Sequence, residues 1–588
     1  MFRWPTASLW RWAILLLVVI AIPLRIHSLD RSFWLDEAWV ANSLLEPDLS
    51  SVFYYDAWLQ TTPPVFLLLQ RLMISVLPVT EQTLRLLPCL FGLLGVGAMV
   101  YLAGRFLRPP MAFVVLFIFS FSPGHVIYSQ MLKQYTSDVL VAIVLMSLGL
   151  AYLKHRTTGL LLTLTGLYVV LAGLSYNAVL FTPALLYGAL FEPPGPDARL
   201  PALRIRWLHA LVVSGAVAVT AMVNFSVFIK PNLDPNILGG PPDHTVLALV
   251  LYKMIDLLRL FKHFFFNLGA PWSGPWLAGL MVGAALVALY GAVHLCARSG
   301  KGMPRNLDKA AVLILPIAGA LALNLLNRYP LGTARLNLFL FPAALILFGL
   351  GLQTLIARGR ILAHRARFGR SWWSGSRPHT AVAVGLAVIL LLRVTTGTPG
   401  EPYFTPLDTY QGLNEDAESA VSYLAEVAGP GDVLYVDTSM LEQVKFYTGL
   451  MPIEGVRLVH GAIAWPCCPR NVTLDRFDRP QEKLPSEVDR IFERSVGDTL
   501  WMIYTGRPSH WEFVGAKFPE LFEQHLSERG CSQIDGPDFI GLQLDKYVCS
   551  EGAAASRSMV TRARQRSRNG AAPAAGRTVD ARSAVTVD

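Results

Sequence analysis

Residues 12–39 read WAILLLVVIAIPLRIHSLDRSFWLDEAW and join a run of almost pure hydrocarbon to two adjacent carboxylates that lie between two tryptophans. The apolar run, residues 12–24, follows two arginines and has no small-residue cleavage site after it. These features favour a retained membrane helix over a signal peptide. We therefore expect this first helix to carry Asp36 and Glu37 to the point where the chain leaves the bilayer.

The composition of the 588-residue chain is typical of a membrane protein. Hydrophobic residues make up 53% of it and charged residues only 15%, whereas average soluble domains carry ~25% charged residues. The mean hydropathy is +0.44. The net charge of +9 does not indicate nucleic acid as a partner, because most basic residues lie in short loops between apolar segments, where they orient a protein in the bilayer.

Eleven apolar segments are predicted to be transmembrane helices. Each is long enough, or nearly so, for the ~20 residues that a bilayer core requires. They lie at residues 10–27, 84–106, 111–127, 138–154, 158–173, 177–192, 207–229, 275–297, 309–326, 334–357 and 379–396.

One further apolar segment, residues 61–82 (TTPPVFLLLQRLMISVLPVTEQ), is too short to span the bilayer. The residues between Pro64 and Pro78 would form a helix of only ~20 Å, whereas the hydrocarbon core is ~30 Å thick. Gln70 and Arg71 also lie at its middle. We predict an interfacial or re-entrant helix.

The distribution of arginine and lysine sets the predicted orientation. If residues 63–78 do not span, the basic loops all fall on one side, and the last of them, 358–378, has several arginines and no acid. The positive-inside rule then places the N-terminus in the cytoplasm and the C-terminal region outside. We expect a multi-pass protein of the cell (inner) membrane.

The composition changes after the last apolar segment. Residues 397–550 contain strand-like runs, DVLYVDT and TLWMIYTG, after a helix-like stretch, and this pattern predicts a small extracytoplasmic α/β domain. Residues 551–588 are rich in Ala, Arg, Ser and Gly and are predicted to be a disordered basic tail. The expected domains are thus 1–396, 397–550 and 551–588.

The six cysteines predict no metal site, because they show neither a C-x-x-C motif nor the Cys/His spacing of zinc sites. Cys531 and Cys549 lie in the predicted outer domain, where an oxidising compartment would allow a disulfide between them. Cys467 and Cys468 could be a redox-active pair, but a structural or incidental role is expected, since adjacent cysteines bridge to each other only with strain.

Four motifs on the predicted outer face, taken in order, resemble those of the GT-C membrane glycosyltransferases. The resemblance is to the group of protein O-mannosyltransferases, lipid A aminoarabinose transferases and RgtA-D-like proteins, and it covers roughly residues 10–360. The motifs are WLDEAW (34–39), TTPPVFLLLQR (61–71), SPGHVIYSQMLKQYTSDVL (122–140) and RYPLGTARLNLFLFP (328–342). The chain departs from the family pattern at Thr62, where His or Lys is frequent, and at Met131, where many relatives have Glu.

The resemblance implies a GT-C fold with about eleven transmembrane helices plus interfacial helices. It also implies transfer of a sugar from a polyprenyl-phosphate donor to a hydroxyl of a glycan, lipid or protein acceptor outside the membrane, with inversion. Such a reaction needs a carboxylate that takes the acceptor's proton and fixed cations that stabilise the leaving phosphate. No cofactor is expected, and a divalent cation is left open.

The acids of the site are predicted by their match to the family motifs. Asp36 is the expected base. Glu37 would point ~100° away if both begin a helix, so we expect it to do a different job. The alternative is that both are solvated acids at a helix exit. Asp138 is either a second acid of the site or an ordinary helix cap.

The donor-binding residues are predicted from cations and aromatic residues of the same motifs. Cations at an outer helix end run against the positive-inside bias, so they need an explanation; lipid-headgroup anchoring is the alternative to phosphate binding. The predicted set is Arg71, Lys133, Tyr135, Arg328, Tyr329 and Arg335.

Two other functions remain open at this point. A secondary transporter or an export protein for lipid-linked glycans would carry ionisable residues within its spans and often an internal repeat. Here the notable charges cluster in outer loops, and no repeat of 20–50 residues is visible, which favours the enzyme. A non-catalytic GT-C homologue is the third alternative, because one cation and one acid of the family pattern are absent.

Overall fold

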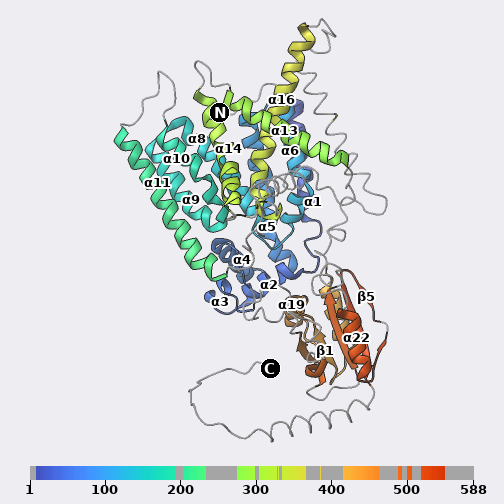
Figure 1. Ribbon diagram of the computed structural model, residues 1–588. Helices are drawn as coiled ribbons and strands as arrows, with labels where there is room; N and C mark the ends of the chain where they lie inside the picture. The colour runs from blue at the N-terminus through green and yellow to red at the C-terminus, as the bar shows by residue number, and fades with distance from the viewer. Residues whose placement is uncertain are drawn as a thin grey trace. The chain divides into compact units, whose positions relative to one another are not determined.

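The chain divides into two compact units (Figure 1). One contains Met1–Glu418, Glu442–Leu450 and Pro466–Thr473, and the other contains Ser419–Leu441, Met451–Trp465 and Leu474–Asp588. The computed structural model describes residues 8–57, 59–191, 203–232, 275–297, 304–326, 329, 331, 334–365, 385, 415–461, 488–492, 499–505, 518–534 and 536–549.

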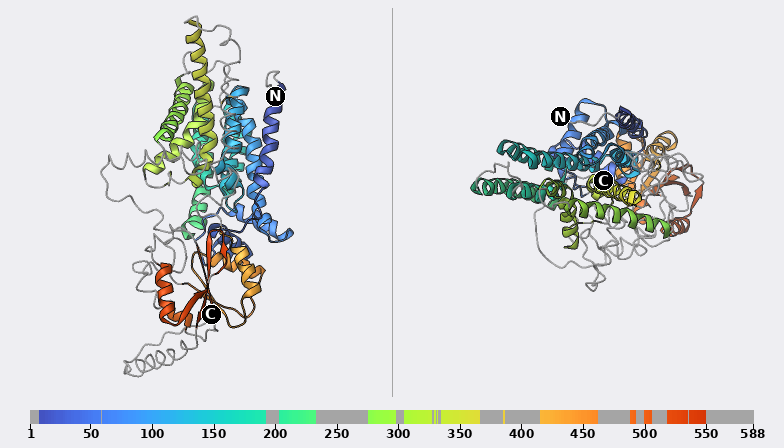
Figure 2. Two further views of the ribbon diagram at one scale, coloured as in Figure 1. Left: turned by 90° about the vertical axis from the view of Figure 1, so that its right-hand side faces the viewer. Right: turned by 90° about the horizontal axis from the view of Figure 1, so that it is seen from above.

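The first unit is a bundle of apolar helices that run beside one another (Figure 2). Its longer helices are α1 (Ser8–Ile26), α5 (Glu81–Phe106), α8 (Tyr135–His155), α9 (Thr158–Leu174), α11 (Leu203–Val223), α13 (Pro275–Ala297), α14 (Pro304–Leu325) and α16 (Phe341–Arg365). Its shorter elements are α2 (Leu35–Leu45), α3 (Leu49–Phe53), α4 (Pro64–Val76), α6 (Pro109–Phe121), α7 (Pro123–Ser129), η1 (Tyr176–Phe181), α10 (Thr182–Leu190), η2 (Asn224–Ile229), η3 (Lys230–Asn232), α15 (Ala334–Asn337) and η4 (Leu338–Leu340).

The predicted apolar segments are helical, although 111–127, 177–192 and 334–357 are each divided between two or more helices. Segment 379–396 falls outside the described residues apart from position 385. Among the residues that the structure describes, five stretches are long and apolar enough to cross a membrane: Glu81–Phe106, Tyr135–His155, Arg204–Asn232, Leu307–Leu325 and Arg335–Gly359. The shorter apolar helices of the described chain are Pro64–Val76, Pro109–Phe121, Thr158–Leu174, Tyr176–Leu190 and Val282–Cys296. The mostly helical, apolar architecture is therefore confirmed, while the number of spans stays a prediction.

Two proline-directed features shape the part of the bundle that carries the site. The helix α4 has 13 residues, about 20 Å, which confirms the short helix predicted within 61–82. The predicted helix 111–127 is instead broken into α6 and α7 at Ser122, whose ψ of 121° is extended. The reason is Pro123, because a proline disfavours helical geometry in the residue before it.

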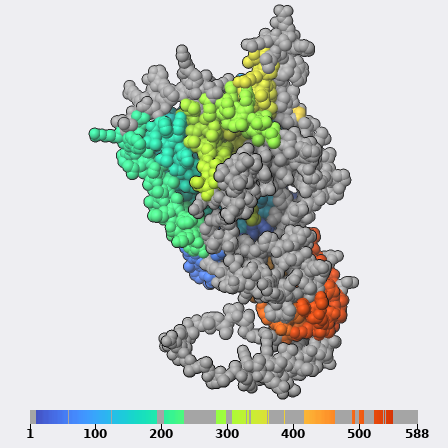
Figure 3. Space-filling view, in the orientation of Figure 1, coloured from blue at the N-terminus to red at the C-terminus, as the bar shows by residue number. Residues whose placement is uncertain are grey.

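The helices pack closely on their inner faces and expose hydrocarbon on the outside. A Cβ at Gly351 would lie 1.9 Å from the Val287 carbonyl oxygen, so glycine is what permits the close approach of α16 to α13. Helix α11 exposes apolar side chains such as Leu211 (70%) and Met222 (64%), and Figure 3 shows this helix at the surface. Such a face suits contact with lipid.

The second unit contains a mixed sheet of order β2-β1-β3-β6-β4, with β5 paired to β6. Strand β1 is parallel to β2 and β3, and β6 is antiparallel to β3 and β4. The elements are α18 (Ala417–Val427), β1 (Val433–Val436), β2 (Arg457–His460), β3 (Thr499–Thr505), α22 (Phe518–Glu528), β4 (Cys531–Ile534), β5 (Asp538–Phe539) and β6 (Leu542–Cys549). Buried residues of β1, β3 and α22 form its core, so the predicted α/β region is confirmed.

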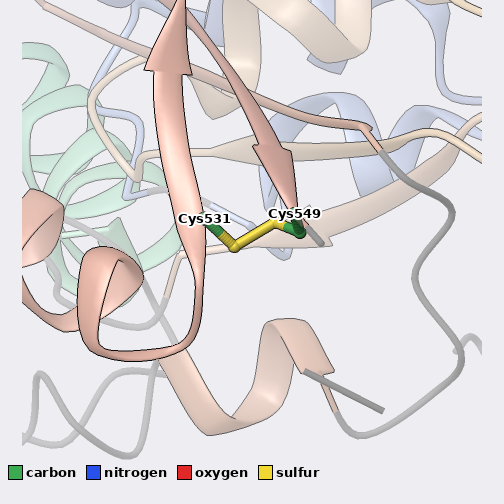
Figure 4. Close-up of a disulfide and its surroundings, with 2 residues drawn as sticks. All are labelled: Cys531 and Cys549. Carbon is green, nitrogen blue, oxygen red and sulfur yellow. A yellow bond between two sulfur atoms is a disulfide. The ribbon is translucent and has the colours of Figure 1, made fainter. Parts of the chain in front are cut away.

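A disulfide joins Cys531 to Cys549 (Figure 4). The two residues are direct cross-strand partners of β4 and β6, and the bridge that the sequence left possible is formed. Cys467 and Cys468 lie outside the described residues, as does the predicted tail 551–588.

The chain between β1 and β2 contributes to the first unit. This connection contains α19 (Leu441–Leu450), of which residues Glu442–Leu450 belong to the helical unit. The domain limits drawn from the sequence stay predictions, but a helix from the region after residue 396 is part of the bundle's own packing.

Replacing both Cys531 and Cys549 by serine should destabilise the second unit by about 2–4 kcal/mol, since the bridge closes a short loop of the unfolded chain. Thermal unfolding followed by near-ultraviolet circular dichroism would measure this, with the free buried Cys89 changed to alanine as the control. An unfolding temperature that is insensitive to reductant would contradict the stabilising role of the bridge.

Candidate active site

The helix α2 starts at the two adjacent acids. Its N-cap, Trp34, is extended and makes no side-chain cap, and Asp36 and Glu37 occupy the first turn, where the helix dipole favours negative charge. Because successive side chains of a helix diverge by ~100°, the two carboxylates meet different partners. The predicted divergence is confirmed: Asp36 contacts Arg335 and Glu37 contacts Arg85.

Asp36 forms a partly exposed ion pair. The Nη1 group of Arg335, in α15, donates to Asp36 Oδ2 at 2.8 Å, with side-chain exposures of 40% for Arg335 and 13% for Asp36. Asp36, which follows the first helix, is thus brought to Arg335, which lies in a segment predicted to bind the donor phosphate. The partial exposure leaves this pair within reach of solvent and of a ligand.

Glu37 forms a fully buried pair that uses both of its oxygens. Arg85, in α5, donates from Nε to Oε1 at 2.8 Å and from Nη2 to Oε2 at 2.7 Å, and both side chains are 0% exposed. The Leu132 N–H also donates to Oε1 at 2.6 Å. Burial raises the pKa of Glu37, but Arg85 and these hydrogen bonds outweigh it, so the pKa lies below its ordinary value. The alternative that the two acids are solvated is therefore wrong for Glu37.

Lys133 lies in the turn between α7 and α8 and is buried, at 6% exposure. Its Nζ stands over the Trp39 ring at 4.6 Å, and it lies in electrostatic range of Asp36 and Arg335, as does Tyr135. Burial lowers the pKa of Lys133 to about 8, against the opposing effect of Asp36. A buried ammonium on an indole face is not a headgroup anchor, so the anchoring alternative is wrong for Lys133.

The two tryptophans of the opening motif support cations. Trp34 and Trp39 are buried, at 7% and 9% exposure, so neither is the membrane-interface belt residue that its position after a membrane helix would suggest. The guanidinium of Arg335 lies 6.0 Å from the Trp34 ring, and Lys133 lies on Trp39. Each indole face thus attracts one cation of the site, and the two acids stand between them in the chain.

Asp138 belongs to a polar chain that reaches the loop before α15. Asn177 Nδ2 donates to Asp138 Oδ2 at 3.2 Å, and the Tyr329 hydroxyl donates to Asn177 Oδ1 at 3.0 Å. The N-cap of α8 is Gln134, and Asp138 is the fourth residue of the helix. Asp138 is therefore not the N-cap, and the capping alternative is wrong.

The other two predicted donor ligands have different positions. Arg71, in α4, donates from Nη1 to the Leu44 carbonyl at the last turn of α2, where a cation suits the helix dipole; the structure shows it holding α2. Arg328 lies outside the described residues. In the described part of the chain no cluster of three or more His, Cys, Asp and Glu residues is arranged to hold a metal.

Two residues that complete this arrangement were not predicted. Arg85 carries the partner charge of Glu37, and its signal was available, since a charge at the start of an apolar helix needs a partner. Asn177, which joins Asp138 to Tyr329, lies in an apolar segment and gave no signal.

No protein-family model and no curated protein matches the chain. Among solved structures, it is similar to the Archaeoglobus fulgidus oligosaccharyltransferase tethered with an acceptor peptide, at 11% identity and a TM-score of 0.47, over 92% of this chain and 74% of that one. AglB of the same organism with an inhibitory peptide and a dolichol-phosphate gives 11% and 0.48, over 90% and 73%. ArnT of Cupriavidus metallidurans bound to undecaprenyl phosphate gives 15% and 0.45, over 92% and 98%. These scores assign the chain to no family, so its function is inferred below from its own residues.

Replacing Arg85 by methionine should cost about 3–5 kcal/mol of stability, because it leaves Glu37 as an unpaired buried charge. Changing Glu37 to leucine in the same protein should recover part of that loss: it removes the unpaired charge, but the Leu29 and Ser32 carbonyls and the Leu132 N–H still lack these partners. Unfolding in detergent would measure both. The exposed Arg105, at the other end of α5, provides the control as Arg105→Met. A double variant as unstable as the single one would contradict the pairing.

Proposed function

We propose that this protein is an integral membrane glycosyltransferase of the GT-C type that transfers a sugar from a polyprenyl-phosphate donor to an acceptor hydroxyl. The observation that carries the proposal is the ion pair of Asp36 and Arg335 next to the buried Lys133. One carboxylate and two cations meet at the end of apolar helices, which is the charge arrangement that this reaction requires. The ordered motifs of the sequence support the same activity.

Asp36 acts as the general base in this proposal. It takes the proton of the acceptor hydroxyl while that oxygen bonds to the anomeric carbon of the sugar. The bond from the anomeric carbon to the phosphate oxygen breaks on the opposite face, so the configuration inverts. The electron pair leaves with the polyprenyl phosphate, and fixed cations stabilise its growing negative charge.

Arg335 and Lys133 are the proposed phosphate ligands. In the structure Arg335 donates a hydrogen bond to Asp36. A donor phosphate would compete with the Asp36 carboxylate for this guanidinium. Binding of the donor would then release the Asp36 carboxylate to accept a proton, which links donor binding to activation of the base. Trp34 and Trp39 keep the two cations in place while this exchange occurs.

The remaining predicted residues take supporting roles. We assign Glu37 to positioning, because its oxygens are occupied by Arg85 and Leu132. Asp138 would orient a sugar or acceptor hydroxyl, with Asn177 and Tyr329 fixing its carboxylate. Tyr135 and Arg328 remain proposed donor ligands.

The reaction is proposed to occur on the extracytoplasmic side of the cell membrane, with the N-terminus in the cytoplasm. The arginine-rich segment 358–378 supports this orientation through the positive-inside rule. The disulfide of the second unit supports it independently, because such bonds persist in oxidising compartments. The acceptor would be a glycan, a lipid or a protein.

Asp36→Asn tests the function directly. The variant is nearly isosteric and cannot take the proton, so transfer should fall by about 10²–10⁴-fold. Donor binding should persist, since Arg335 loses a competitor. The assay is transfer from a panel of radiolabelled polyprenyl-phosphate sugars by purified protein, with the exposed Asp56→Asn as the control. Near-normal turnover in Asp36→Asn would refute the base, and a wild-type protein that transfers none of the sugars would refute the function.

The affinity for polyprenyl phosphate should weaken above pH 8. The pKa of Lys133 is about 8, and the ammonium, the form that attracts phosphate, is lost as the pH rises through that value. At pH 9 the affinity should be about tenfold lower than on the acid side, because about one lysine in ten is still charged. Lys133→Arg keeps its charge and should give a flat profile. Titration of each protein with polyprenyl phosphate measures this, and an equal slope in both would exclude Lys133.

A further inference from the structure

We infer that α19, from the connection between β1 and β2, is a positioning element that holds the Asp36-bearing helix α2 through Glu442 and Tyr447. This inference rests on the proposed function, because it concerns the same carboxylate. It places Glu442 and Tyr447 among the residues that determine turnover, although they follow Asp36 by about four hundred positions.

Glu442 makes the main contact with α2. Its Oε2 accepts from Asn42 Nδ2 at 2.7 Å and from the Tyr55 hydroxyl at 2.8 Å. Asn42 Nδ2 also donates to the Glu442 carbonyl oxygen at 2.9 Å. Asn42, Tyr55 and Glu442 are 5%, 2% and 1% exposed. Hydrogen bonds to a buried carboxylate are strong because few other partners are available there.

Tyr447 holds the chain directly before α2. The Phe33 N–H donates to the Tyr447 hydroxyl at 2.8 Å, and Tyr447 is fully buried. The adjacent Phe446 packs edge-on against the Phe33 ring, with centroids 5.1 Å apart. The helix α19 therefore contacts both α2 and Phe33, the residue before its Trp34 cap.

The contacts of α2 lie in different directions around its axis. At ~100° per residue, Glu37 is about 100° from Asp36, and Asn42 is about 120° from it on the other side. Glu37 is held by α5 and Asn42 by α19. An isolated helix shorter than ~12–15 residues is marginal, so the 11-residue α2 needs these fixings to present Asp36 in one orientation.

A small displacement of Asp36 would affect the reaction more than the fold. A misplacement of about 1 Å in a reacting group can cost on the order of a hundredfold in rate. Loss of the contact at Glu442 should therefore lower kcat and leave the phosphate ligands, which lie on other elements, almost unchanged. This separates positioning from a general loss of structure.

The test uses the full-length protein with Glu442→Gln, Asn42→Asp and their combination. In Asn42→Asp two carboxylates face each other. In the double variant the amide introduced at position 442 can donate to the carboxylate introduced at position 42, while the amide oxygen accepts from Tyr55. We expect kcat to fall about tenfold in Glu442→Gln and further in Asn42→Asp, with the donor KM within about twofold. The double variant should recover part of the rate, because the side-chain hydrogen bond returns while the Glu442 carbonyl oxygen keeps no donor at position 42. Glu454→Gln, at an exposed acid just after α19, is the control.

Amide hydrogen exchange of residues 33–45 supplies a readout that does not depend on transfer. Exchange should be faster in both single variants and should return towards the wild-type rate in the double variant. Unchanged exchange of residues 33–45 in the single variants would contradict the inference that α19 holds α2. Faster exchange with an unchanged kcat would overturn the positioning role. A wild-type protein without transfer activity would refute the proposed function and the positioning role with it, while exchange would still decide whether α19 holds α2.

Discussion

The buried pair of Glu37 and Arg85 is the interaction on which the candidate site depends. Taking two charges out of water is costly, and the cost is met only when geometry is good and the remaining hydrogen-bonding groups are satisfied. Here the pair is bidentate, and Arg85 also donates to the carbonyls of Leu29 and Ser32 at 3.0 and 3.1 Å. The guanidinium therefore fixes the whole turn before α2 to α5, and the position of Asp36 follows from it.

Two neighbouring acids acquire opposite properties from their surroundings. Glu37 is enclosed and has every oxygen engaged, whereas Asp36 keeps partial exposure and meets an arginine that is itself 40% exposed. Glu37 is suited to a fixed structural ion pair, and Asp36 is suited to an ion pair that a ligand can exchange. The tryptophans on either side add cations near Asp36, because Arg335 lies by the Trp34 ring and Lys133 on the Trp39 ring, whereas the cation bonded to Glu37 is the buried Arg85.

The site is assembled from segments that are distant in the chain, and the short helix α2 connects them. It receives Arg85 from α5, Arg71 from α4, Arg335 from α15 and Glu442 from α19. Each contact uses a different face or end of the helix. Because α19 lies between β1 and β2 in the chain, the segment that forms the sheet is covalently joined to the helix that holds α2.

The sequence by itself determined the apolar helices, the short α4 and the presence of an α/β region, and it allowed the Cys531–Cys549 bridge. These features depend on hydropathy, proline positions and compartment, which are local or compositional properties. It also indicated Asp36, Lys133 and Arg335 as members of one site. Only the tertiary structure decided that Glu37 is locked by Arg85, that Asn177 joins Asp138 to Tyr329, and that Glu442 holds α2. Pairings of this kind depend on which helix faces meet after packing, and residues far apart in the chain carry no local mark of the partner that packing will give them.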